Sequence, residues 1–354
     1  MKKYTPFKIG SRKIDINNKP FIVAEMSGNH NNSLNRALKI IDAAAKCGAD
    51  AIKLQTYTAD TITLDSNKKY FQIKDSKSLW NNETLHSLYE KAHTPWKWHK
   101  KLMQHARKRG IICFSAPFDL TAVDFLEELN CPIYKIASFE NNHLPLIEKV
   151  SLTKKPIIIS TGMATKKELL EIVKILNKNR CKNYMFLKCT SSYPASPSES
   201  NLITIKEMKK ILKCEVGLSD HTMGVGVAIA SVAHGATLIE KHFTLDRNDG
   251  GVDSAFSMDP NELSTLVQES NNAWQASGKI LFGPSKSEKI SVKFRRSIFF
   301  SKNLKKGEII SEENIKVIRP SNGLDPKYFF KILGKKVKSD VEKGTPVRWS
   351  LIKK

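Results

Sequence analysis

Polar and charged side chains stand in or directly after eight short apolar runs of this sequence. Buried lysines and carboxylates destabilise a fold unless they are paired, so their repetition at equivalent places predicts a functional site. Any one of these side chains taken singly could have an ordinary structural role. The prediction of a functional site rests on their occurrence at all eight runs. The residues that we single out are Glu25, Lys53, Gln55, Ser115, Lys135, Ser138, Ser160, Ser191, Tyr193, Ser219, His221, Glu240 and His242.

The lysines and hydroxyl groups of this set are suited to an anion. Lys53 and Lys135 each lie within an apolar run, and the serines stand near the ends of such runs. Ammonium and hydroxyl groups bind phosphate and carboxylate oxygens through charge-assisted hydrogen bonds. We therefore expect these side chains to form a pocket for an anionic substrate.

Two histidines and a glutamate are suited to a metal ion. His221 follows the seventh run, and His242 lies in the eighth run, two residues after Glu240. Because side chains alternate along a strand, Glu240 and His242 share a face. Imidazole and carboxylate groups are ligands for a divalent metal, and its open positions can polarise a carbonyl group. Glu25, at the end of the first run, is then a candidate general acid or base.

Lysines in a cluster of strands also suit another class of enzyme, a Schiff-base aldolase, in which a desolvated lysine attacks a carbonyl group. The histidine pair argues against it, because that chemistry needs no metal. Inhibition by a chelator would favour the metal-dependent reading, and trapping of a substrate on a lysine with borohydride would favour the aldolase.

Parallel strands that alternate with helices would bring these side chains together. The first helix is indicated by apolar residues at helical spacing from Leu34 to Ala45 and stops before Gly48, and Thr165 with Glu168 forms a capping box that begins another helix. Eight such units predict a closed (β/α)8 barrel rather than an open doubly wound sheet, with its site at the C-terminal ends of the strands. The predicted strands are Pro20–Met26, Ala51–Gln55, Ile111–Ala116, Pro132–Ala137, Pro156–Thr161, Tyr184–Thr190, Cys214–Ser219 and Thr237–Phe243.

Two regions interrupt the repeat. Residues 56–98 form a long insertion after the second strand, with Trp80, Trp96 and Trp98, and we interpret it as a lid rather than a packed surface subdomain. The barrel pattern ends at residue 276. Residues 277–292 are typical of a linker, and residues 293–354 predict a small β-rich domain from short strand-like pieces with Gly and Pro turns.

Composition restricts the class of protein. The 354 residues are 40% hydrophobic and 26% charged, as in a soluble globular protein, and no apolar run is long enough to span a bilayer. The N-terminal residues lack the apolar stretch of a signal peptide, so we expect a cytoplasmic protein that contacts no membrane. The formal net charge of +23 comes from lysines spread along the predicted helices, and we interpret it as favouring small anionic substrates rather than nucleic acid.

Several segments resemble one enzyme family, in order, along nearly the whole chain. They are AEMSGNHN, AIKLQTYTADT, FSAPFD, YKIASFE, STGMAT, KCTSSYPA, VGLSDHT and IEKHFTLDR. These segments resemble the sialic acid synthases, which condense phosphoenolpyruvate with an N-acetylated sugar aldehyde. The C-terminal segments FRRSIFF, KKGEII, IRPSNGL and GTPVRW resemble the antifreeze-like (SAF) domain of that family.

The branch of the family that the chain most resembles is that of the pseudaminic acid synthases. EMSGNHN, GGVDSAFS and the tryptophan-rich insertion carry this resemblance, and it implies an N-acetylated 6-deoxy sugar of the 2,4-diacetamido-2,4,6-trideoxy-altrose type. Phe139 stands where N-acetylneuraminate synthases usually have glycine, and Ser191 where they have asparagine. An N-acetylneuraminic or legionaminic acid synthase is the alternative within the family.

The resemblance also implies a role for each residue. Lys53, Lys135 and the serines at 138, 160, 191 and 219 would hold phosphoenolpyruvate, with Gln55 and Tyr193 lining the pocket. His221 and His242 would bind Mn²⁺, or else Mg²⁺ or Co²⁺, and Glu25 would transfer protons. Asp253 would contact the sugar, and Arg319 would reach the partner's barrel in a domain-swapped homodimer. An independent binding module is the other interpretation of residues 293–354.

Overall fold

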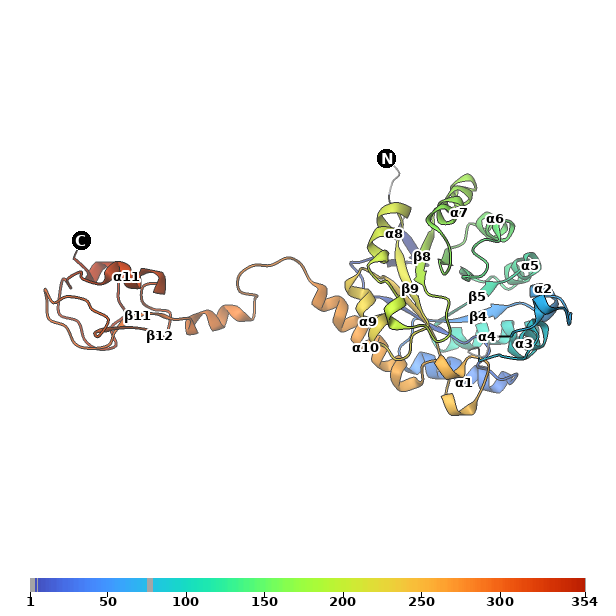
Figure 1. The fold of residues 1–354 in the computed structure, drawn as a ribbon, viewed down its shortest axis with the longest axis horizontal. Helices are drawn as coiled ribbons and strands as arrows, with labels where there is room; N and C mark the ends of the chain where they lie inside the picture. The colour runs from blue at the N-terminus through green and yellow to red at the C-terminus, as the bar shows by residue number, and fades with distance from the viewer. Residues whose placement is uncertain (1–3, 5, 75–78, 354) are drawn as a thin grey trace. The chain divides into compact units, whose positions relative to one another are not determined.

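The computed structural model describes residue 4, residues 6–74 and residues 79–353, and it contains a closed barrel of eight parallel strands (Figure 1). The strands follow one another around the barrel in chain order, and the last pairs with the first to close it. The predicted barrel is therefore confirmed. Its strands are β3 (Phe21–Glu25), β4 (Ala51–Thr56), β5 (Ile112–Pro117), β6 (Tyr134–Ile136), β7 (Ile157–Ser160), β8 (Tyr184–Cys189), β9 (Val216–Asp220) and β10 (Leu238–His242).

Helices connect successive strands and cover the outside of the barrel (Figure 1). The first begins at the Ser33 cap and ends just before Gly48, whose positive φ of 86° suits glycine. The expected capping box is present, with Glu168 and Thr165 bonded to each other's backbone N–H groups. The main helices are α1 (Leu34–Lys46), α4 (Trp96–Lys108), α5 (Leu120–Glu128), α6 (Leu144–Leu152), α7 (Lys166–Lys178), α8 (Thr204–Leu212), α9 (Gly226–Ala233) and α10 (Pro260–Ser277).

A short N-terminal hairpin, which the strand count did not include, packs beside the N-terminal ends of the barrel strands. It consists of β1 (Phe7–Ile9) and β2 (Arg12–Ile14). The hydroxyl of Tyr4 donates to Glu215, one residue before β9, over 2.7 Å. Because Phe7 and Ile14 are buried in the barrel core, this hairpin extends the core at the end away from the predicted site.

The insertion contains two short helices and one 3-10 turn, and its residues 75–78 lie outside the described part of the chain. These elements are α2 (Ala59–Ile62), η1 (Lys69–Phe71) and α3 (Leu85–Ala92). Its two ends are tied together, because Thr56 Oγ1 lies 2.8 Å from His99 Nε2 and Trp96 Nε1 donates to the Tyr57 carbonyl over 3.1 Å. The insertion is therefore anchored at its base, where it leaves and rejoins the barrel.

Residues 279–354 form a second compact unit with its own core. Two antiparallel strands, β11 (Ser297–Phe300) and β12 (Ile315–Ile318), pack with α11 (Phe329–Ile332). The other predicted strand pieces make only single β-bridges, such as Ile309 with Lys336. Part of the predicted linker is a 3-10 helix, η5 (Glu288–Phe294).

Across the described residues, none of the helices has the length and apolar content that crossing a bilayer requires.

Candidate active site

A cavity of about 520 Å³ opens at the C-terminal ends of the barrel strands. Gln55, Ser138 and His242 line it from the strand ends, and side chains of the insertion line it from the other side. We call it the rim cavity. Its position is the one that the barrel fold predicts for an active site.

Four charged side chains lie inside the barrel, one inward-facing layer below Gln55 and His242. We call Glu25, Lys53, Lys135 and Glu240 the charged quartet. Lys53 Nζ lies 2.6 Å from Glu25 and 3.8 Å from Glu240, and Lys135 Nζ donates to Glu240 over 3.0 Å. All four are almost fully buried, with at most 5% of each residue exposed. Each charge therefore has a partner, and the quartet is neutral when all four groups are ionised.

The quartet shifts the pKa values of its members. Burial, together with the charge of Glu240, raises the pKa of Glu25 to about 7, although Lys53 opposes the shift. Burial lowers the pKa of Lys135. Burial also acts to lower the pKa of Lys53, but the charges of Glu240 and Glu25 outweigh it and raise that pKa. Glu25 can thus gain or lose a proton near neutral pH, as a general acid or base requires.

Hydroxyl groups converge around Gly162, just after β7. The Gly162 N–H donates to Ser138 Oγ over 3.2 Å, and a Cβ on this glycine would lie 2.0 Å from Ser191 Oγ. Only glycine lets the backbone approach both hydroxyls so closely. Ser160 is buried and its hydroxyl has no hydrogen-bond partner among the described residues, as expected for a group that binds a ligand. Ser219 donates to Glu240 of the quartet over 3.1 Å.

Ser115 does not join this group, and its predicted role in substrate binding is corrected. It pairs with Leu54 on β4, whereas the inward-facing Lys53 pairs with Phe114. Because side chains alternate along a strand, Ser115 faces the outer helices. Its hydroxyl lies 2.6 Å from that of Thr56, which in turn contacts His99 of α4. Ser115 therefore helps to anchor the insertion and does not contact the site.

The two histidines lie together, with ring centroids 5.3 Å apart. His221 Nδ1 is 2.8 Å from the Thr190 carbonyl, so a proton on that nitrogen leaves Nε2 free as a ligand. Burial and the neighbouring His221 lower the pKa of His242 well below its ordinary value and keep its imidazole neutral, and within the described part of the chain its buried Nδ1 has no hydrogen-bond partner. Burial acts to lower the pKa of His221, but the charge of Cys189 and hydrogen bonds to Cys189 and Thr190 outweigh it and raise that pKa, so this imidazole would release its proton on binding a divalent ion such as Mn²⁺.

Glu240 does not complete this pair as a third metal ligand, which corrects the prediction. Its Oε1 bonds Lys135 and Ser219, one layer below the histidines. Within residues 4, 6–74 and 79–353, no three His, Cys, Asp or Glu side chains converge as a metal-binding group. The two imidazoles would leave the remaining positions of an ion to water or substrate.

Asp253 and Tyr193 lie beside the histidines. Asp253 Oδ2 is 4.0 Å from His242 Nδ1, and it accepts hydrogen bonds from the Ser27 hydroxyl and the Gly28 N–H. Burial raises the pKa of Asp253. The Tyr193 ring lies 4.4 Å from that of His221, centroid to centroid, and lines the rim cavity. Both predicted residues are thus placed where a substrate can reach them.

Glu140 was absent from our list of site residues, although it lies in the rim cavity. Burial raises its pKa to about 7, and its buried Oε2 accepts no hydrogen bond from any residue that the structure describes. The sequence could have indicated Glu140 through its position two residues after Ser138, at the end of the same predicted strand. Arg319 is exposed just after β12 in the second unit, and its predicted role stays a prediction.

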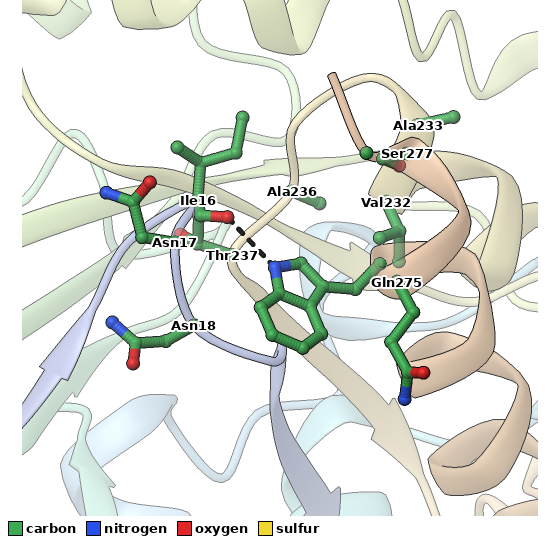
Figure 2. A pocket seen from close by; sticks show the side chains of 11 residues that line it. Ile16, Asn17, Asn18, Val232, Ala233, Ala236, Thr237, Gln275 and Ser277 are labelled. Atoms are coloured by element: carbon green, nitrogen blue, oxygen red, sulfur yellow. Dashed lines mark hydrogen bonds between the residues drawn. The ribbon is translucent and has the colours of Figure 1, made fainter. Parts of the chain in front are cut away.

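A second cavity, of about 590 Å³, lies at the N-terminal end of the barrel strands (Figure 2). Its lining includes Ile16 and Asn17 before β3, Thr237 before β10 and Trp274 of α10. We call it the base cavity. None of the side chains that line it is titratable, so it offers no group for proton transfer.

Fold and site together define a barrel enzyme with buried lysines, converging hydroxyl groups and an imidazole pair at the C-terminal ends of its strands. The NeuB family model matches residues 40–281, and the SAF domain model matches residues 295–353. The chain therefore belongs to the NeuB family, and the resemblance found in the sequence is confirmed.

Individual relatives are similar over most of their length. A pseudaminic acid synthase of Campylobacter jejuni is 45% identical over 94% of this chain and 96% of its own. One of Helicobacter pylori is 42% identical over 93% of this chain and 96% of its own. The crystal structure of an N-acetylneuraminic acid synthetase from Leptospira borgpetersenii, in complex with citrate, is 32% identical, with a TM-score of 0.73 over 83% of this chain and 98% of that one.

Proposed function

We propose that this protein is a pseudaminic acid synthase, which condenses phosphoenolpyruvate with 2,4-diacetamido-2,4,6-trideoxy-L-altrose to give pseudaminic acid and phosphate. The observation that carries the proposal is the charged quartet beneath a paired-imidazole site, in a chain up to 45% identical to pseudaminic acid synthases. The quartet supplies positive charge and a proton-transfer group, and the imidazoles supply metal ligands.

Phosphoenolpyruvate would bind to the quartet lysines and the hydroxyls around Gly162. With Glu25 protonated, the quartet carries a net positive charge, which favours an anion. Ser138, Ser160 and Ser191 would donate to phosphate or carboxylate oxygens. Lys53 is paired with carboxylates that raise its pKa, so it stays an ammonium group and not the neutral amine that Schiff-base chemistry needs.

The reaction forms one carbon–carbon bond and breaks one carbon–oxygen bond. C3 of phosphoenolpyruvate attacks the aldehyde carbon of the open-chain sugar, and positive charge develops at C2. Water adds at C2, and the resulting tetrahedral carbon expels phosphate by cleavage of its C–O bond. The keto acid then closes to its ring form. Glu25, with a pKa of about 7, would take one proton from the added water and return it to the leaving phosphate, and the second water proton ends on the former aldehyde oxygen, which becomes a hydroxyl group.

His221 and His242 would hold the divalent ion, Mn²⁺ or else Mg²⁺ or Co²⁺. Bound there, the ion would act as a Lewis acid toward the aldehyde oxygen. Asp253 would hold the sugar beside the histidines and Tyr193 would pack against it. A chelator should therefore abolish phosphate release, whereas an aldolase would survive chelation and be inactivated by borohydride in the presence of substrate.

The active form would be a cytoplasmic domain-swapped homodimer in which Arg319 reaches the partner's barrel. A mixing experiment tests this assignment. Glu25→Gln and Arg319→Ala proteins should each be inactive alone, and mixing them under exchange conditions should restore part of the activity. Full activity of Arg319→Ala on its own would leave the second unit without a catalytic role and favour an independent binding module.

The sugar is tested by phosphate release with phosphoenolpyruvate and Mn²⁺. The 2,4-diacetamido-2,4,6-trideoxy-L-altrose substrate is compared with the sugar of the legionaminic acid synthases and with N-acetylmannosamine. We expect the highest kcat/KM with the altrose sugar. A higher kcat/KM with either of the others would assign the chain to the corresponding branch, and phosphate release with none of them would contradict the proposal.

A further inference from the structure

A buried ion pair joins β9 and β10 on their outer side, next to the two histidines. Asp220 and Lys241 face each other across these strands, with Lys241 Nζ 2.9 Å from Asp220 Oδ2, and both residues are buried. Each is the residue directly before one of the histidines. Because side chains alternate along a strand and Glu240 faces inward to bond Lys135, Lys241 points to the outer side of the barrel. The pair does not line the rim cavity, so it can affect the site only through the residues beside it.

The backbone holds the two histidines in different ways. His242 is the last residue of β10 and pairs with Glu25 of β3 within the barrel ladder. His221 comes after the end of β9, and the ladder between β9 and β10 stops at Asp220. Its carbonyl accepts a hydrogen bond from the Ala195 N–H of a neighbouring loop over 3.0 Å. The position of His221 therefore depends on contacts of its own loop rather than on the barrel ladder.

Asp220, Thr222 and Lys241 supply contacts on both sides of His221, and we call these three residues the clamp. Asp220 Oδ1 accepts a hydrogen bond from the Thr222 N–H over 3.0 Å, and Asp220 Oδ2 accepts one from the Thr222 hydroxyl over 3.1 Å. Lys241 Nζ also donates to the Thr222 carbonyl. The ammonium group on the strand of His242 therefore holds the residue that follows His221.

Stability alone does not account for the clamp. Moving two charges out of water costs about as much free energy as their attraction contributes, so a buried ion pair adds little net stability. An apolar side chain at position 241 would fill the same space. Only a hydrogen-bond donor can bond the Thr222 carbonyl, however, and so connect β10 to the loop that carries His221.

We propose that the clamp positions His221 relative to His242 and thereby sets the affinity of the imidazole pair for a divalent ion. This inference rests on the proposed function, since it takes the two imidazoles as the metal ligands. The clamp residues are positioning residues and do not themselves contact the ion or a substrate. Their hydrogen bonds keep the two rings together, at the centroid separation of 5.3 Å, so that one ion can contact both.

The experiment measures Mn²⁺ binding to the full-length protein by electron paramagnetic resonance, without phosphoenolpyruvate or sugar. Asp220→Asn and Lys241→Met each remove one charge of the clamp and keep the approximate shape of the side chain. Each should weaken Mn²⁺ binding by roughly 10–100-fold, as expected for loss of an outer-shell partner. Binding of phosphoenolpyruvate in the absence of metal, measured by calorimetry, should change little, because the charged quartet is not part of the clamp.

A double variant separates positioning from stability. Each single substitution leaves the other charge buried without its partner, which destabilises the fold. Asp220→Asn combined with Lys241→Met removes both charges, so its free energy of unfolding in urea should return toward the wild-type value. Its Mn²⁺ binding should stay as weak as in the single variants, because the bond to the Thr222 carbonyl is still missing. The double variant also supplies the measurement if a single variant does not fold.

Lys209→Met is the matched control. Lys209 pairs with Glu215 over 2.9 Å, just before the other end of β9, and its loss should leave Mn²⁺ binding unchanged. Wild-type Mn²⁺ affinity in the double variant, or an equal loss of affinity in the control, would overturn the inference. If the wild-type protein binds no Mn²⁺, or if His221→Ala and His242→Ala bind it as tightly as the wild type, it is the metal site of the proposed function that fails.

Discussion

The rim cavity and the base cavity have similar volumes, about 520 and 590 Å³, but different chemistry. The rim cavity lies at the C-terminal strand ends, above four buried charges, and His242 of the imidazole pair lines it. The base cavity lies among amides, a threonine, a tryptophan and small apolar side chains (Figure 2). Volume therefore does not identify the site. In a parallel barrel the catalytic groups gather where the strands end and long loops can be added, and the opposite end contributes to stability.

The largest expected effect is the loss of turnover when Glu25 of the charged quartet is replaced. Glu25→Gln removes the group with a pKa of about 7 and should lower kcat by roughly 10³-fold, within the range for a general acid or base. Because the amide keeps the shape of the side chain, binding of phosphoenolpyruvate, measured by calorimetry, should change little. Wild-type turnover in the Glu25→Gln protein would contradict the proton-transfer role of Glu25.

The next effect concerns metal affinity. His221→Ala and His242→Ala each remove one of two imidazole ligands, and Mn²⁺ binding followed by electron paramagnetic resonance should weaken by more than the roughly 10–100-fold that loss of an outer-shell partner costs. His105→Gln is the control, because that histidine pairs with Asp42 between the outer helices. If the two alanine variants bind Mn²⁺ as tightly as the control, the ion is held elsewhere.

The third prediction concerns stability, because burial of the Glu140 carboxyl group in the rim cavity should lower the free energy of unfolding at high pH. The pKa of Glu140 rises from 4.5 to about 7 on folding, so the folded protein binds this proton more tightly. The contribution of this proton to the free energy of unfolding is complete below pH 4.5, falls as the pH rises from 4.5 to 7, and is absent above pH 7. Glu140→Gln should therefore raise the free energy of unfolding at pH 8 by an amount on the order of 3 kcal/mol and change it little at pH 4.5, in urea titrations.

The exposed Glu128 of α5 provides the matched control for that measurement. Glu128→Gln should leave the free energy of unfolding nearly unchanged at both pH values. If Glu140→Gln gave the same change at pH 4.5 and pH 8, burial of its carboxylate would not be the cause.

The smallest effect lies in the base cavity. Trp274→Phe removes the 2.9 Å hydrogen bond from Nε1 to the Ile16 carbonyl, and should cost about 1 kcal/mol of stability without changing kcat or KM. Thermal unfolding and the phosphate-release assay measure the two quantities. A fall in kcat/KM would show that the base cavity takes part in function. It would contradict the view that only the rim cavity is functional.

The sequence alone predicted the barrel, its eight strands and most of the rim residues. Local pattern suffices for these, since apolar runs, helix caps and the polar groups after each run are properties of short segments. The motifs also located the histidine pair and the quartet lysines, which lie in or directly after barrel strands, and Asp253 came from the resemblance of GGVDSAFS to the family. Arg319 remains a prediction from resemblance.

Tertiary structure decided which neighbours those residues have. Ser115 faces the helices because the pairing of β4 with β5 puts it in line with Leu54, and a run of apolar residues does not reveal which alternate positions face inward. Glu240 bonds Lys135 because strands distant in sequence bring them within 3.0 Å, and this contact holds its Oε1 in the quartet, one layer below the histidines. The lining of the rim cavity by side chains of the insertion and the burial of Glu140 also depend on contacts between segments far apart in the chain. Sequence determines which chemical groups reach the rim, and the closed barrel determines which of them meet.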